Sequence, residues 1–190
     1  MAVFEFWYRN VQIWQTRSPI NDTNYASIAL RVGADKFGPV TRSCGDMSAN
    51  PQIHGVDLKL QAEIPNDGTL VVIGWSIANS SQGGDQLTNA LGNTAISLVG
   101  EAATAIPGIG PVLGVTINVL FGGFFRDHDG ICEAGNASAI GQQLNNMPSH
   151  TNWWIQHKTY GNGLPDPDGH KDSGDYSSTL VVYRPGEYAG

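Results

Sequence analysis

Strict alternation of apolar and polar residues from Val56 to Ile64 is the clearest pattern in the chain. It places five side chains on one face of a strand and four on the other, which predicts a strand with one buried face. Asn66-Asp67-Gly68 then marks a turn. The next run, residues 70–78, is apolar on both faces, so we expect a strand at the centre of a covered sheet.

Four further segments have strand patterns. Residues 26–32 alternate, and residues 3–15 alternate with one change of parity, which predicts a single strand with a bulge or two strands. Residues 152–160 and 176–184 are rich in the aromatic and β-branched side chains that strands favour. Residues 161–175, between these two segments, are mostly turn formers and predict a long loop.

Residues 86–125 break from this pattern, because Glu101 is their only charged residue. Apolar residues recur at spacings of three and four over 85–105, which predicts a helix. The run Ile106-Pro-Gly-Ile-Gly-Pro111 ends it. Residues 112–125 fit a second helix, although their β-branched residues leave a strand open.

The patterns together predict a mainly β protein. We expect an antiparallel β-sandwich of seven or eight strands, with an apolar helical hairpin inserted at about 86–125. A chain of 190 residues without internal repeat or linker fits one domain over 1–190.

Composition excludes several classes of protein. Only 14% of the residues are charged, against about a quarter in an average protein, and 41% are hydrophobic, which excludes a disordered chain. The net charge is −7 and no basic run exists, which argues against nucleic acid as a partner.

The apolar hairpin is the most unusual feature of the sequence. Two short apolar arms joined by a Pro- and Gly-rich turn could enter a bilayer, or could fill the core over one face of the sheet. The stretch from Ile106 to Gly114 resembles in composition the hydrophobic helices of bacterial insecticidal pore formers, over less than a tenth of the chain. The residues that mark this segment are Glu101, Pro107, Gly108, Gly110, Pro111 and Gly114.

Carboxylates gather in the last third of the chain, where residues 127–190 carry eight Asp and Glu against three Lys and Arg. Oxygen ligands on a loop are what Ca²⁺ prefers, which predicts a calcium site; the alternative is a solvated loop whose aspartates stabilise turns. The candidate ligands are Asp127, Asp129, Asp166, Asp168, Asp172 and Asp175.

Adjacent aromatic residues indicate a third kind of site. Neighbouring side chains on a strand point to opposite faces, so one of Trp153 and Trp154 faces outward unless the hairpin covers it. An outward Trp beside Asn, Asp and His side chains, His157 among them, is typical of a sugar-binding surface. A core position or a subunit contact is the alternative.

Enzymatic motifs are missing from the sequence. It contains no Gly-x-Ser-x-Gly, no phosphate-binding loop, no Cys-x-x-Cys and no His-Glu-x-x-His, and its five histidines are scattered. We therefore expect a protein that is not an enzyme.

The two cysteines leave two possibilities. Cys44 and Cys132 could form one disulfide, or could be free thiols in a reducing compartment. No signal-peptide pattern begins the chain, so we expect either a cytoplasmic protein or one released without such a signal.

Three functions follow from these features. The first is a toxin-like or defence-type protein that acts on membrane lipid through the sequestered hairpin. The second is a Ca-assisted, lectin-like module that binds a cell-surface glycan. The third is a structural or self-assembling protein, and a homo-oligomer is compatible with each of them.

Overall fold

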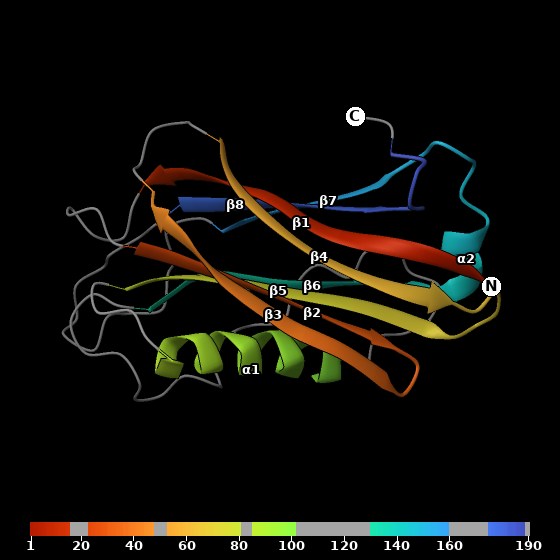
Figure 1. Cartoon of the computed structure of the whole chain (residues 1–190), viewed down its shortest axis with the longest axis horizontal. Coiled ribbons are helices and arrows are strands. Elements are labelled where there is room, and N and C mark those ends of the chain that lie inside the picture. The colour runs from red at the N-terminus through yellow and green to blue at the C-terminus, as the bar shows by residue number, and fades with distance from the viewer. Residues whose placement is uncertain (16–22, 48–52, 81–84, 102–129, 160–174, 189–190) are drawn as a thin grey trace.

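Two four-stranded antiparallel sheets face one another and form a sandwich (Figure 1). The computed structural model describes residues 1–15, 23–47, 53–80, 85–101, 130–159 and 175–188. The first sheet has the strand order β4-β1-β8-β7 and the second sheet has the order β3-β2-β5-β6. The strands are β1 (Ala2–Gln15), β2 (Thr23–Val32), β3 (Asp35–Asp46), β4 (Ile53–Ile64), β5 (Leu70–Ser80), β6 (Gly130–Ile140), β7 (Trp153–Thr159) and β8 (Asp175–Tyr183), and the helices are α1 (Asp85–Glu101) and α2 (Gly141–Asn145).

The predicted sandwich is confirmed, with eight strands in the described part of the chain. β4 contains the alternating segment, and the turn after it is held by a 2.8 Å bond from the Thr69 amide to the Asp67 carboxylate. β1 is one strand whose register shifts between Tyr8 and Asn10, which is the predicted bulge.

The main core fills the space between the two sheets. From β1 it receives Phe4, Phe6 and Tyr8 before the bulge, and Val11 and Ile13 after it. All five are fully buried. The side chains of β1 that alternate with these five therefore stand on the outer face of the first sheet, which positions the site described below.

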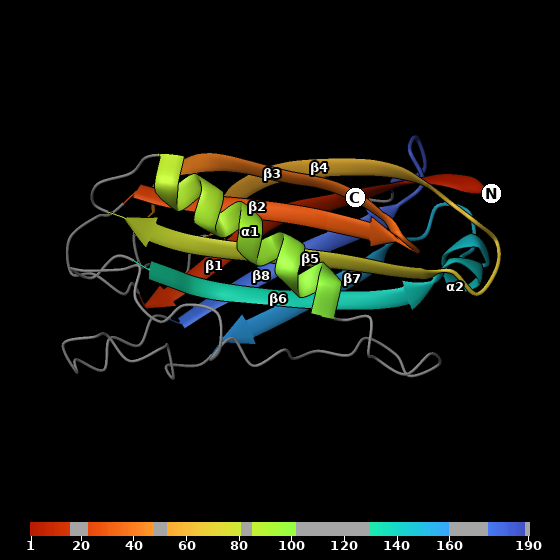
Figure 2. The ribbon, with the colours of Figure 1, turned by 90° about the horizontal axis from the view of Figure 1, so that it is seen from below.

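Helix α1 covers the outer face of the second sheet (Figure 2). Ala95 and Val99 of the helix pack on Ala29 and Val72 of the sheet, forming a second, smaller core. The approach is close at Gly74, where a Cβ would lie 2.7 Å from the Ala95 carbonyl oxygen. β5 is apolar on both faces because one face packs in the main core and the other packs against α1.

Side chains of the second sheet also bind the backbone of α1. Ser76 donates to the Leu91 carbonyl at 3.3 Å, and Asn136 donates to the Leu98 carbonyl at 3.3 Å. Near the end of the helix, Arg31 donates to the Gly100 carbonyl at 3.3 Å. A cation at this end complements the helix dipole.

The predicted helical hairpin is represented by α1 alone. The helix ends at Glu101, and residues 102–129, with the predicted second arm and Pro107, Gly108, Gly110, Pro111 and Gly114, lie outside the described residues. In the part of the chain that the structure describes, no helix combines the length and the apolar character needed to cross a membrane.

Candidate functional site: an aromatic face on the first sheet

Two tryptophans lie in one row across the outer face of the first sheet. Trp7 of β1 pairs with Val181 of β8, and Val181 pairs with Trp154 of β7. The two tryptophans are therefore two strand spacings, or about 10 Å, apart. Trp154 is 42% exposed and Trp7 is half-buried. Lys59 of β4 extends the row on the other side of Trp7.

Bulges place two further side chains on this face. Between its paired positions with β8, β1 has one extra residue at Arg9 and another at Trp14. On the other side, two β4 residues oppose Arg9, and one of them, Asp57, has a left-handed backbone with φ of 55°. Bulges of this kind re-aim side chains and are common next to functional sites.

The guanidinium of Arg9 lies among three aromatic rings. Its Cζ is 5.4 Å from the centre of the Trp7 ring and 5.3 Å from that of Trp154. The ring of Tyr188, beyond the end of β8, is 6.0 Å away. Each distance is within the range of a cation–π interaction, so the rings hold the cation in place.

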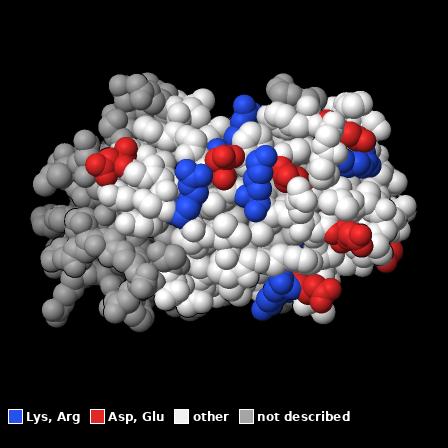
Figure 3. All heavy atoms as spheres, viewed as in Figure 1, with Lys and Arg blue, Asp and Glu red and all other residues white. Residues whose placement is uncertain are grey.

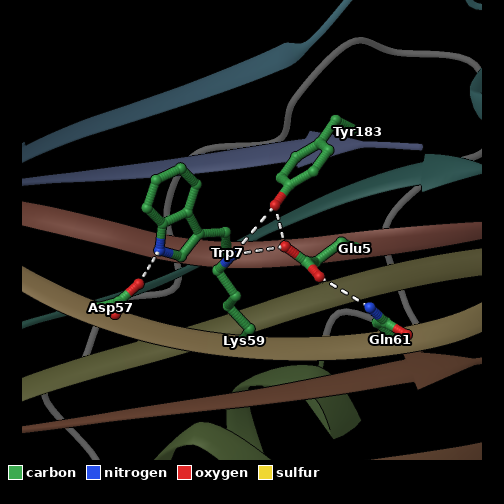
Figure 4. A network of polar contacts seen from close by, with 6 residues as sticks. All are labelled: Glu5, Trp7, Asp57, Lys59, Gln61 and Tyr183. Atoms are coloured by element: carbon green, nitrogen blue, oxygen red, sulfur yellow. Dashed lines mark hydrogen bonds and ion pairs between the residues drawn. The ribbon is translucent and has the colours of Figure 1, made fainter. Parts of the chain in front are cut away.

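Polar contacts fix the orientation of Trp7 (Figure 4). Its indole N–H donates to Asp57 at 2.9 Å, and the ammonium of Lys59 lies 4.7 Å from the ring centre. Tyr188 meets the same ring edge to face, with the centres 5.5 Å apart. The indole is thus held before any ligand arrives.

Glu5 is the centre of this polar network (Figure 4). Only 8% exposed, it accepts hydrogen bonds from Tyr183 and, at 2.8 Å, from Gln61. Lys59 pairs with it at 2.9 Å and also donates to the Tyr183 hydroxyl at 3.3 Å. The charge of Glu5 is therefore satisfied within the protein, and the group supports the tryptophan row rather than offering a free carboxylate.

A second aromatic position, Trp14, lies further along β1 on the same outer face of the first sheet. Trp14 is 47% exposed, and the ammonium of Lys158 lies 4.9 Å from its ring centre. Between Trp14 and the Trp7–Trp154 row, the register places five neutral polar residues on the same face: Asn10, Gln12, Gln156, Ser177 and Thr179. We call the two aromatic ends and the polar residues between them the aromatic face.

This arrangement suits a ligand with apolar patches and many hydroxyls. Indole rings pack against the C–H faces of sugar rings, and amide and hydroxyl side chains pair with sugar hydroxyls. Charged side chains of both signs are interspersed over the neighbouring edge of the molecule, which includes β4 (Figure 3). The site is therefore amphipathic rather than uniformly charged.

The predicted pair of tryptophans divides between the two faces. Trp153 packs against the main core, and Trp154 is the outward residue. His157, the third residue predicted to bind the sugar, lies opposite Ser178 in the strand register; the structure does not describe its side chain.

The predicted calcium ligands fall where the structure is not described. Asp127, Asp129, Asp166, Asp168 and Asp172 lie outside the described residues, and Asp175 is described only as the first residue of β8. Within the described ranges, no group of three His, Cys, Asp or Glu could hold a metal ion.

The candidate disulfide is absent. Cys44 and Cys132 are not joined by a disulfide; they lie on β3 and β6, which are the two opposite edges of the second sheet. Three strand spacings, about 14 Å, separate these edges, and a disulfide requires Cα atoms within about 7 Å. Burial raises the pKa of the Cys44 thiol, which disfavours the nucleophilic thiolate.

A hydrogen-bonded chain crosses the main core. Ser178 donates to Glu133 at 2.6 Å, and its hydroxyl lies 2.7 Å from that of Tyr8. Glu133 is 1% exposed, so the chain joins the two sheets out of contact with water. Burial and the nearby Glu133 raise the pKa of Tyr8 well above its usual value.

Two hollows lie at the edges of the sandwich. A cavity of about 350 Å³ lies between the edge strands β6 and β7 beneath α2, lined by Leu144, Met147 and Trp153 among others. A wider hollow of about 650 Å³ lies at the opposite edge, between the β2–β3 turn and β4. Neither contains the aromatic pairs of the first sheet.

Sequence reasoning did not identify Arg9, Lys59 or Tyr188 as site residues. One signal was available, since Phe4, Phe6 and Tyr8 share a parity that leaves Glu5, Trp7 and Arg9 on the other face. That Arg9 reaches Trp154 depends on the pairing of β1 with β8 and of β8 with β7, which joins distant parts of the chain.

Comparisons with known proteins assign no family. No protein-family model matches the chain, and no curated protein matches it. Among solved structures, the chain is similar to the C2A domain of plant Extended Synaptotagmin 1, at 7% sequence identity and a TM-score of 0.43, over 96% of this chain and 95% of that one.

Proposed function

We propose that the chain is a carbohydrate-binding module and that the aromatic face binds the sugar. The observation that carries this proposal is the Trp7–Val181–Trp154 row, in which two tryptophans stand on one face of the first sheet on strands about 10 Å apart. That spacing is comparable to the length of a disaccharide unit, so the two indoles can pack against different sugar rings of one chain.

The polar residues beside the row support the same ligand. A glycan presents many hydroxyls, and Gln156 and Thr179, with the residues that continue to Trp14, provide neutral donors and acceptors along the face. A purely apolar ligand would leave these groups unpaired at a cost. An extended oligosaccharide that follows β1 from Trp7 to Trp14 satisfies both kinds of group.

Preformed geometry favours binding by this face. Trp7 is held by Asp57, Lys59 and Tyr188. Arg9 in turn contacts Trp154. Side chains that are already ordered lose little conformational entropy when a ligand binds.

Affinity electrophoresis tests the proposal. The protein is run in gels that contain one soluble polysaccharide each, covering glucans, xylans, galactomannans and acidic polymers, with and without a calcium chelator. We expect retardation by at least one polymer, and loss of retardation in Trp154→Ala. Val40→Ala, which removes an exposed side chain from β3 of the second sheet, is the matched control and should run as wild type. Unaltered migration in every gel would reject the proposal.

Membrane action through residues 86–125 stays a prediction. In the described arm, α1 packs on Ala29 and Val72, so release of a hairpin would expose this apolar surface of the second sheet. Liposome leakage measured between pH 4 and 8, with and without Ca²⁺, tests it. The helical hairpin, the calcium site of the acidic loop and self-assembly stay predictions in the same sense.

A further inference from the structure

We propose that Arg9 selects a ligand with a carboxylate, so that the glycan bound by the aromatic face is acidic, such as a polyuronate. This inference rests on the proposed function and deepens it. Arg9 is the extra residue of the first bulge in β1, and its guanidinium stands beside both members of the tryptophan row.

Among the described residues, the guanidinium of Arg9 contacts the three rings of Trp7, Trp154 and Tyr188 and has no hydrogen-bond acceptor. Cation–π contacts use the charge of the group, while a guanidinium also has five N–H donors in its plane. Indole rings have no acceptor for these donors.

Lys59, the other cation beside Trp7, is neutralised by the protein itself, because it pairs with Glu5 at 2.9 Å. The carboxylate of Asp57 accepts a hydrogen bond from Trp7. Among the described residues, no carboxylate pairs with Arg9, although it is half-buried.

A carboxylate is the complement that this geometry fits best. It can accept two parallel N–H bonds from one guanidinium, and the rings around Arg9 already fix the position of the group. A uronate residue carries its carboxylate at the edge of a sugar ring. It can therefore pack on one indole while its carboxylate reaches the cation between the two.

Matched polymers test the assignment. Affinities are measured for polygalacturonate, alginate and hyaluronan, each beside its carboxyl-reduced form, with wild type, Arg9→Gln and Arg9→Lys. Arg42→Gln removes an exposed charge from β3 of the second sheet and controls for net charge. Circular dichroism and thermal melting confirm that each variant is folded.

We expect Arg9→Gln to bind an acidic polymer about tenfold or more weakly than wild type, with less than about a twofold change for its carboxyl-reduced form. Arg9→Lys keeps the charge and should bind at an intermediate affinity, because it loses the paired geometry. Arg42→Gln should bind as wild type.

Three results would overturn the assignment. Equal affinity of wild type for acidic and carboxyl-reduced polymers would show that the protein does not recognise the carboxylate. A similar loss of affinity for the acidic polymer in Arg42→Gln would show that the effect comes from net charge. In both cases sugar binding itself would stand, whereas failure to bind any acidic or neutral polymer would reject the proposed function as well.

Discussion

Trp7 and Trp154 lie in one cross-strand row with Val181 between them, and the guanidinium of Arg9 is 5.4 Å from one ring and 5.3 Å from the other. The unit needs β1 together with β7 and β8, which lie more than a hundred residues later in the sequence. The row supplies stacking surface, and the cation between the rings supplies charge.

Trp154→Ala should weaken polysaccharide binding while leaving the fold intact. Loss of a stacking indole is expected to cost about 1–2 kcal/mol of binding, or five- to thirtyfold in affinity. Because the side chain is 42% exposed, its removal should lower the free energy of unfolding by less than about 1 kcal/mol. Calorimetric titration and urea unfolding measure the two quantities. Equal affinity in wild type and variant would remove Trp154 from the site.

Gly74→Ala should weaken the docking of α1 on the second sheet. The added Cβ would lie 2.7 Å from the Ala95 carbonyl oxygen and 3.0 Å from Val99, so helix and strand must separate. We expect a loss of about 1–3 kcal/mol in the free energy of unfolding. Gly100→Ala in the same helix meets nothing within 4 Å and should be neutral or stabilising. Equal stability of the two variants in urea would contradict this packing.

Tyr8 should limit the stability of the protein at alkaline pH. Its folded pKa is raised, so the folded state keeps a proton that the unfolded chain releases above about pH 10. The stabilisation is complete below that pH and is lost as the pH rises toward the folded value.

Unfolding measured from pH 7 to 11 tests this sign. Tyr8→Phe should be about 0.5–1.5 kcal/mol less stable than wild type at pH 7, since the contact with Ser178 is lost, and its stability should fall less steeply above pH 10. Parallel alkaline slopes for wild type and Tyr8→Phe would contradict the assignment.

Most of the sandwich could be predicted because the burial of each strand leaves a pattern in its sequence. β4 alternates regularly, and the doubly apolar β5 indicated a covered sheet. β3 was not predicted, since it is an edge strand, mostly exposed, with Gly38 and Pro39 inside it. β6 was not predicted either, because many of its residues are small and are not typical of a strand. Packing against the second sheet's Trp75 requires a small residue here, since a Cβ on Gly135 would lie 2.6 Å from that ring.

The candidate site was predictable only in part. An outward tryptophan follows from strand geometry, and Trp154 is that residue. The row it shares with Trp7 depends on register between strands that are more than a hundred residues apart in sequence. The extra residue at Arg9 likewise arises from that register, and no local pattern of residue types marks it.

The indole N–H resonances of the protein test whether the aromatic face binds a sugar. Nitrogen-edited NMR spectra are recorded during titration with an oligosaccharide cut from the polysaccharide that retards the protein in gels. The account predicts that the Trp7, Trp14 and Trp154 signals shift together with the dose, while that of Trp75, fully buried in the core, stays in place. Shifts confined to the second sheet or to the cavity beside Trp153, with the three outer indoles unchanged, would contradict it.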